Sequence, residues 1–390
     1  MTAIKCFTYS VAVPTSSDPQ TTTGDRLFGL VEAYAALGDH RTGSDVDRAT
    51  VVWLADRLRA IGLEVTVEPV GFDRATADAH LRVDGSEVAC LPVPYEWTGT
   101  IVTEAVGVAA FDPMSGGLPS VLDDPIAAAR ARGAEAAVLV TEHPNGSLVG
   151  VNRVLGEPGS GFPTLLAAGR DLERRQSGRV SVDLTAQVSP GQTANIVAGN
   201  HRPGNPVVLT TPLTGWFTCA GERGTGIAVL LELVERFRHQ PLKVVLTGGH
   251  ELGYFGAHRW VDANPAPPAA IVHVGASIAV DAPTDTGRDL VASRLAMTSL
   301  SEESAQPVTR ALQPVGLALI PSTEQWIGEG EAWSRLGVPL LSTTGAGIDF
   351  HTPEDTPERA TTPLSLAVVA DAMTDATAAL IDIGDNGSAR

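Results

Sequence analysis

The chain has 390 residues, of which 43% are hydrophobic and 18% are charged, a composition typical of a folded globular protein. This length is comfortable for two domains. The 27 Lys and Arg residues against 45 Asp and Glu residues give a formal net charge of −18. Phosphate backbones bind cationic surfaces, so this charge argues against nucleic acid as a partner. The three cysteines lie far apart, which argues against a disulfide framework and a cysteine-based zinc site.

The N-terminal 23 residues contain only a weak, interrupted apolar run. A signal peptide needs a continuous apolar segment followed by small residues, and a membrane span needs roughly 18 or more apolar residues. We therefore expect residues 1–23 to form an N-terminal arm, the protein to be cytoplasmic, and no membrane to be a partner.

Residues 24–75 begin an α/β pattern. Apolar residues recur at helical spacing over 25–37 and 45–61, and Gly62 is a typical helix stop. From Leu63 onward apolar and polar residues alternate, which predicts a half-exposed strand.

The pattern changes between residues 76 and 190. Short apolar runs at 101–110, 136–140 and 180–184 are separated by turns rich in Gly and Pro, with one Ala-rich helix predicted over 124–132. These short strands and the single helix predict a small β-rich α+β domain. We expect it to be inserted into a larger domain made from residues 24–75 and 191–390.

Strands and helices alternate from residue 195 to the C-terminal region. Continuous apolar runs predict strands at 207–211, 242–247, 271–274 and 339–343, and helical periodicity predicts helices at 226–238, 254–262 and 362–380. Strands that are apolar on both faces indicate a sheet covered by helices on both sides. The predicted fold is therefore α/β, with a mixed, largely parallel central sheet.

Titratable residues gather at the ends of these strands, where sites form in such sheets. Four segments there resemble, in order and spacing, the zinc-dependent aminopeptidase and glutamate carboxypeptidase family, which includes glutaminyl cyclase. They are Thr193-Ala-Asn-Ile-Val, Gly221-Glu-Arg-Gly-Thr-Gly, His250-Glu-Leu-Gly-Tyr-Phe-Gly and Phe350-His-Thr-Pro-Glu-Asp-Thr. Residues 76–190 resemble the protease-associated domain inserted in many members. The resemblance implies a zinc-exopeptidase-like fold.

The resemblance also implies a metal site. The family typically binds two zinc ions, but the two positions unique to one of them carry Pro212 and Gly275, which have no ligating side chain. The ligands implied for the other ion are Glu222, Glu251 and His351. Two carboxylates and an imidazole form an acceptable catalytic zinc set with one open position. The expected cofactor is therefore one zinc ion.

The position of the family's general base carries His250. Its unperturbed pKa of about 6.5 suits proton transfer near neutral pH. His250 could also ligate the metal. Glu329 and Glu331 lie in a stretch that resembles the family's acidic substrate-side loop, and we expect substrate contact or proton relay from them.

Structural roles compete with several functional ones. A Glu at a helix start, such as Glu222, stabilises the helix dipole without any metal. His273 lies in an apolar strand, where a satisfied core histidine is the more common case, although it could contact substrate. Trp216 and Phe217 could wall a substrate pocket or belong to the core. Arg223 could pair with Glu222 or bind a substrate carboxylate.

Our leading hypothesis is a mononuclear zinc hydrolase that cleaves an amide-like bond in a small molecule or short peptide. One alternative keeps the fold but changes the reaction to that of a one-metal cyclase or lyase of the glutaminyl cyclase type. Another is a non-catalytic binding protein that has lost peptidase activity.

Overall fold

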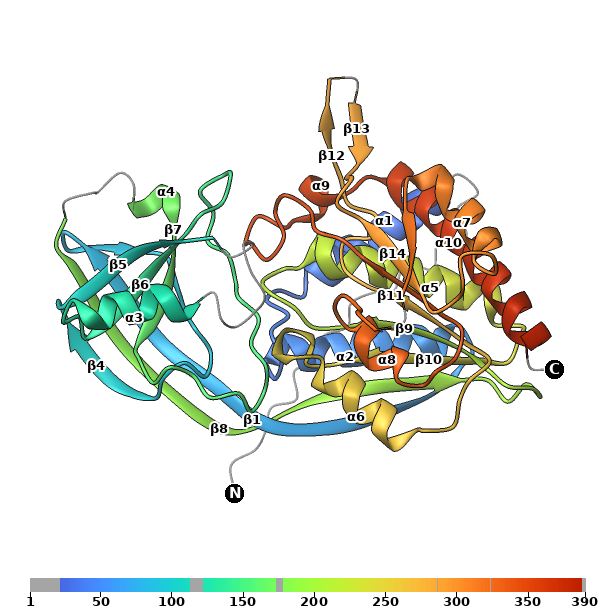
Figure 1. The fold of residues 1–390 in the computed structure, drawn as a ribbon, viewed down its shortest axis with the longest axis horizontal. Coiled ribbons are helices and arrows are strands. Elements are labelled where there is room, and N and C mark those ends of the chain that lie inside the picture. The colour runs from blue at the N-terminus through green and yellow to red at the C-terminus, as the bar shows by residue number, and fades with distance from the viewer. Residues whose placement is uncertain (1–21, 113–121, 173–177, 286, 323, 388–390) are drawn as a thin grey trace.

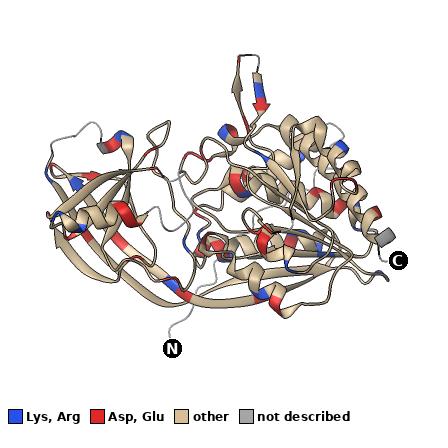
Figure 2. Cartoon of the chain, viewed as in Figure 1, with Lys and Arg blue, Asp and Glu red and all other residues tan. Residues whose placement is uncertain are grey.

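The computed structural model describes residues 22–112, 122–172, 178–285, 287–322 and 324–387. Two lobes lie side by side, a large α/β lobe and a smaller β-rich lobe (Figure 1). Acidic and basic residues are scattered along the chain in both lobes (Figure 2). Residues 1–21, most of the predicted arm, lie outside the described residues. Helix α1 (Thr23–Ala35) begins directly after Thr22, whose hydroxyl accepts the Asp25 N–H at 3.2 Å.

The main sheet has ten strands in the order β15-β14-β16-β11-β9-β10-β8-β1-β2, with β4 also paired to β8. It forms the centre of the large lobe and extends into the smaller lobe, where β4 lies (Figure 1). Strands β10, β9, β11 and β16 are mutually parallel, and β8, β1, β2 and β14 join antiparallel. The bounds are β1 (Glu64–Val83), β2 (Ser86–Val88), β4 (Gly99–Thr103), β8 (Val180–Gly199), β9 (Val207–Pro212), β10 (Leu242–Thr247), β11 (Ala270–Val274), β14 (Leu295–Thr298), β15 (Ala318–Pro321) and β16 (Leu340–Thr344).

Helices cover both faces of this sheet. The main core packs one face under α1, α2 (Asp45–Ala60), α5 (Thr225–Phe237), α7 (Gln306–Leu312) and α10 (Pro363–Gly387). The other face packs on α6 (Phe255–Ala263) and α8 (Gly330–Ser334). Leu209 faces the first core and its neighbour Val208 faces the second, so successive residues of one strand are buried on opposite sides. The predicted mixed α/β sheet with helices on both faces is confirmed.

The smaller lobe has a four-stranded sheet in the order β3-β7-β6-β5. Its elements are β3 (Cys90–Pro92), β5 (Val106–Phe111), α3 (Asp123–Ala131), β6 (Ala136–Thr141), β7 (Thr164–Ala168) and α4 (Gly169–Leu172). The two lobes share strands β1 and β8, which pair from Glu64↔Gly199 to Val83↔Val180 and run along both (Figure 1). The predicted domain boundaries at 75/76 and 190/191 therefore fall inside continuous strands.

A projecting hairpin and the length of α10 are two further features of the large lobe. Strands β12 (Asp281–Thr284) and β13 (Gly287–Leu290) form a hairpin that projects from the lobe (Figure 1). Helix α10 is long and apolar enough over Pro363–Gly384 to meet the length and composition of a membrane span, and 56% of its most apolar window is buried inside the protein. Its apolar side chains, among them Leu366, Met373 and Leu380, belong to the main core.

Candidate functional site

A cavity of about 240 Å³ lies at the carboxyl ends of β10, β11 and β16, the edge at which parallel strands place sites. The loop before α8 and residues 149–152 of the smaller lobe close it. We call it the dyad cavity. The side chains in its lining that can form hydrogen bonds or change protonation are Asn152, His250, Tyr254, His273, Glu329, Thr344 and His351.

The central pair of the dyad cavity is His250 and Glu329. His250 lies in the 3₁₀ turn η4 (His250–Leu252) after β10, and its Nδ1 is 3.1 Å from Glu329 Oε2. Thr247 Oγ1 donates to the other oxygen, Glu329 Oε1, at 2.6 Å, and Trp333 Nε1 donates to it at 3.4 Å. Both side chains are buried. In the described part of the chain His250 Nε2 has no hydrogen-bond partner, so it is the nitrogen available to a ligand.

Burial sets the protonation of this pair. It raises the pKa of Glu329 to about 7, against the opposing effects of the Thr247 donor and the Arg223 charge. Burial also holds the pKa of His250 well below its usual value, and the nearby Arg223 cation adds to this effect. When Glu329 is ionised, the neutral imidazole donates Nδ1–H to it. Nε2 then carries a free lone pair, as a general base requires.

His273 on β11 is the second imidazole of the cavity. Its Nδ1 is 2.9 Å from the Ser342 hydroxyl on β16, directly across the ladder. The residue is 2% exposed, and its Nε2 is buried without a hydrogen-bond partner among the described residues. His273 is therefore not the satisfied core histidine that an apolar strand favours. Burial lowers its pKa to about 3, so the ring is neutral at physiological pH.

Glu222 anchors a separate charged network behind the cavity wall. It lies in a π-helical turn, η3 (Ala220–Gly224), that leads into α5. Arg223 Nη2 donates to Glu222 Oε1 at 2.6 Å, and the Cys219 thiol donates to Oε2 at 3.2 Å. Glu222 and Arg223 are each 1% exposed. Burial alone would raise the pKa of Glu222, but the Arg223 and His351 charges outweigh burial and lower it to about 2.

His351 completes this network. Its Nε2 is 3.1 Å from Glu222 Oε1, and its Nδ1 is 3.1 Å from the carbonyl oxygen of Gly150 in the smaller lobe. Both ring nitrogens thus lie within hydrogen-bond distance of an oxygen atom, Glu222 Oε1 for Nε2 and the Gly150 carbonyl oxygen for Nδ1.

The backbone around the site is held in an unusual conformation. Cys219, Tyr254 and His351 have φ values of 55°, 57° and 60°, in the left-handed region that side chains other than glycine rarely adopt. Asp355 supports the turn η3, because its carboxylate oxygens accept the N–H groups of Gly221 at 2.7 Å and Glu222 at 3.0 Å. Its bonds fix the position of Glu222.

Glu251 does not join Glu222 and His351. Its Oε1 accepts the Thr42 N–H at 2.5 Å and its Oε2 accepts the Thr214 hydroxyl at 2.9 Å. Among the described residues, no group of three or more His, Cys, Asp and Glu side chains is placed to hold a metal ion. The structure therefore brings Glu222 and His351 together but places Glu251 apart from them. The buried Arg223 guanidinium already neutralises Glu222, so these residues do not fit the single zinc ion that the resemblance implies.

Other expected site residues lie away from the dyad cavity. Arg223 bonds Glu222 and the Thr214 carbonyl oxygen through Nη2 and Nε, and its Nη1 has no hydrogen-bond partner among the described residues. Glu331 is exposed on α8 and does not line the dyad cavity. Trp216 donates to Asn152 Oδ1 at 2.8 Å and, like Phe217, packs in the core of the smaller lobe.

Sequence reasoning missed Tyr254, Asn152 and Ser342. Tyr254 lines the cavity with its ring 4.8 Å from that of His250. It follows His250 by four residues, a spacing that could have suggested contact. Ser342 is found only through the pairing of β11 with β16, and Asn152 only through the approach of the smaller lobe.

Residues 204–377 match the profile of peptidase family M28, so the large lobe contains a peptidase family M28 domain. This confirms the family resemblance that the four motif segments indicate. No curated protein sequence matches the chain.

Solved structures of the same fold extend the likeness over both lobes. The zinc aminopeptidase BSAP from Bacillus subtilis is 16% identical with a TM-score of 0.71, over 91% of this chain and 94% of that one. A peptidase M28 precursor from Shewanella amazonensis SB2B is 18% identical with a TM-score of 0.67, over 91% and 92%. An aminopeptidase from Aneurinibacillus sp. strain AM-1 is 16% identical with a TM-score of 0.60, over 91% and 93%. At these identities the likeness concerns the fold.

Proposed function

We propose that the protein is an acid–base catalyst that cleaves an amide-like bond in a small molecule or short peptide and does so without zinc at Glu222. The observation that carries the proposal is the buried pair of His250 Nδ1 and Glu329 Oε2, with Nε2 open to the dyad cavity. The fold shared with zinc aminopeptidases supports the class of bond. The ion pair of Glu222 with Arg223 argues against the zinc-dependent version of the reaction.

The proposed reaction adds water to the carbonyl carbon. As the water oxygen bonds to that carbon, His250 Nε2 takes a proton from the water, and Glu329 stabilises the resulting imidazolium through Nδ1–H. His273 Nε2 carries a hydrogen when Ser342 donates to Nδ1, and it can then donate to the developing oxyanion, as can the Tyr254 hydroxyl. The imidazolium returns the proton to the nitrogen as the C–N bond breaks. The products are an acid and an amine.

A library of dipeptides and N-acylated amino acids in heavy-oxygen water tests the proposed function. We expect the wild-type protein to convert members of the library into acids that carry one heavy oxygen, detected by mass spectrometry. The His250→Ala variant should be inactive, and the control His201→Ala, which changes an exposed histidine, should behave as wild type. Products without the label would indicate a cyclase or lyase. Ligands that bind but are not converted would indicate a binding protein, and both results would contradict hydrolysis.

The pH dependence of kcat/KM tests the protonation of the pair. Below about pH 7 the Glu329 carboxyl is protonated, and its O–H donates a hydrogen bond to His250 Nδ1. The hydrogen of the neutral imidazole then lies on Nε2, so Nε2 can no longer act as the base. We therefore expect kcat/KM to rise with pH through about 7 and then to level off. The Glu329→Gln variant should lose this rise. A profile that is flat or falls over the same range in the wild-type protein would contradict the assignment.

A further inference from the structure

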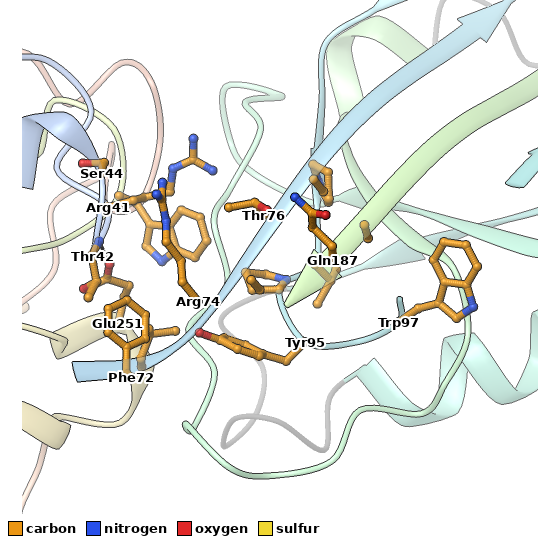
Figure 3. A pocket seen from close by; sticks show the side chains of 18 residues that line it. Arg41, Thr42, Ser44, Phe72, Arg74, Thr76, Tyr95, Trp97, Gln187 and Glu251 are labelled. Atoms are coloured by element: carbon orange, nitrogen blue, oxygen red, sulfur yellow. Dashed lines mark hydrogen bonds between the residues drawn. The ribbon is translucent and has the colours of Figure 1, made fainter. Parts of the chain in front are cut away.

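A second cavity of about 190 Å³ lies between the lobes, and we call it the lobe cavity (Figure 3). Its walls are the loop of residues 41–44, the middle of β1 and β8, the loop of residues 92–97, and Glu251–Leu252. It shares no lining residue with the dyad cavity. His250 and Glu251 are consecutive, yet the first lines the dyad cavity and the second lines the lobe cavity.

Aromatic side chains form the apolar part of the lobe cavity. Phe72 comes from β1, Tyr95 and Trp97 from the loop that follows β3, and Trp216 from the loop after β9. Phe72 and Trp216 are buried, and the rings of Tyr95 and Trp97 are half-buried. Such walls bind flat or branched apolar groups. In pockets of this kind, a small number of polar groups among the apolar side chains fix the orientation of the ligand.

One positive charge of the cavity is unpaired. Among the described residues the Arg74 guanidinium makes no ion pair and no hydrogen bond, whereas Arg41 pairs with Asp39 at 2.9 Å. Two glycines lie close to the stem of Arg74, so that a side chain at either position would contact it. A Cβ at Gly191 would lie 2.5 Å from Arg74 Cβ, and one at Gly43 would lie 3.1 Å from Arg74 Cδ.

One negative charge of the cavity is also unpaired. Glu251 is 3% exposed, and its carboxylate is bonded only by the neutral donors of Thr42 and Thr214. No cation lies within ion-pair distance of it in the described part of the chain. A buried carboxylate without a counter-charge is costly, and a ligand cation would relieve that cost. Figure 3 shows Arg74 and Glu251 on the same side of the cavity, with Trp97 and Gln187 opposite.

We propose that the lobe cavity binds a small zwitterion with an apolar body, whose carboxylate is held by Arg74 and whose ammonium group is held by Glu251. The two unpaired charges of opposite sign match the two charges of such a ligand, and the aromatic walls match its body. The volume lies below the roughly 300–1,000 Å³ of pockets for drug-sized ligands, which favours a molecule of amino-acid size. This site does not depend on the proposed function of the dyad cavity.

Titration calorimetry of the full-length protein with phenylalanine tests the proposal. We expect saturable binding. Phenylacetate, which lacks the ammonium group, and phenethylamine, which lacks the carboxylate, should each bind at least about tenfold more weakly, because each loses one charge-assisted contact. The Arg74→Gln and Glu251→Gln variants should each weaken the binding of phenylalanine by a similar factor.

Arg48→Gln is the matched control, because Arg48 is an exposed arginine that pairs with Asp45 on the neighbouring helix α2. It should bind phenylalanine as the wild-type protein does. Glu251→Gln risks misfolding because Glu251 is buried, but Arg74 is only half-buried on a long strand, and an unchanged melting temperature verifies that its variant is folded. The proposal is overturned by an absence of saturable binding to phenylalanine, by unchanged affinity in Arg74→Gln, or by equally tight binding of phenylacetate.

Discussion

Replacement of Arg223 by Gln is expected to make this protein respond to zinc. The substitution removes the guanidinium that neutralises Glu222, and it leaves that buried carboxylate with only His351 within ion-pair distance. Breaking such a pair costs about 3–5 kcal/mol, so the free energy of unfolding should fall by that amount in the absence of metal. Zinc that binds only the folded variant should then restore stability. The wild-type melting temperature should not change with added zinc.

Arg294→Gln provides the control for this experiment. Arg294 is also buried, but its guanidinium donates to the carbonyl oxygens of Val291, Ile278 and Val315 rather than to a carboxylate. Its loss should lower stability without creating a response to zinc. One zinc per wild-type chain by elemental analysis, lost in Glu222→Gln, would show that Arg223 does not take the place of the metal.

Replacement of His250 by Ala is expected to reduce turnover by roughly 10²–10⁴-fold, which is the usual contribution of general acid–base catalysis. The side chain lies against Glu329 with Nε2 open to the dyad cavity, so its removal deletes the proposed base. His250→Glu, which restores the residue that the family carries there, should recover part of the loss, because a buried carboxylate can also accept a proton. Steady-state kinetics on a library substrate measure both effects.

The metal content of the same variants separates two roles of His250. If His250 is the base, its loss should leave the metal content unchanged. If His250 is a metal ligand, its loss should lower metal content and turnover together. Turnover equal to wild type in both variants would remove His250 from the mechanism.

Much of the fold could be predicted, because its strands are short and continuously apolar. The run at 242–247 coincides with β10, and 207–211 differs from β9 by one residue. The long pairing of β1 with β8 could not be predicted. Its partners lie more than a hundred residues apart in the sequence at Glu64 and Gly199, and most residues of β1 are exposed or only partly buried, so the apolar pattern does not fix the register.

The candidate site was predictable as a set of residue types but not as an arrangement. His250 and Glu251 are adjacent and follow Gly249, whose backbone is left-handed at φ 82°, yet His250 lines the dyad cavity and Glu251 lines the lobe cavity. Glu251 is held by a donor from Thr42, over two hundred residues earlier. Arg223 could pair with Glu222 or bind a ligand, and only the structure shows that it pairs with Glu222.

The shared strands β1 and β8 give the two lobes a mechanical stiffness that a flexible linker would not give. Rotating one lobe away from the other would require many main-chain hydrogen bonds of the ladder to break together, each with a net contribution of about 0.5–1.5 kcal/mol. The spacing between the lobes, and with it the width of the lobe cavity, is therefore set by backbone pairing. The loops that line the cavities, residues 92–97 at the lobe cavity and residues 149–152 at the dyad cavity, lie outside this ladder and can move without breaking it.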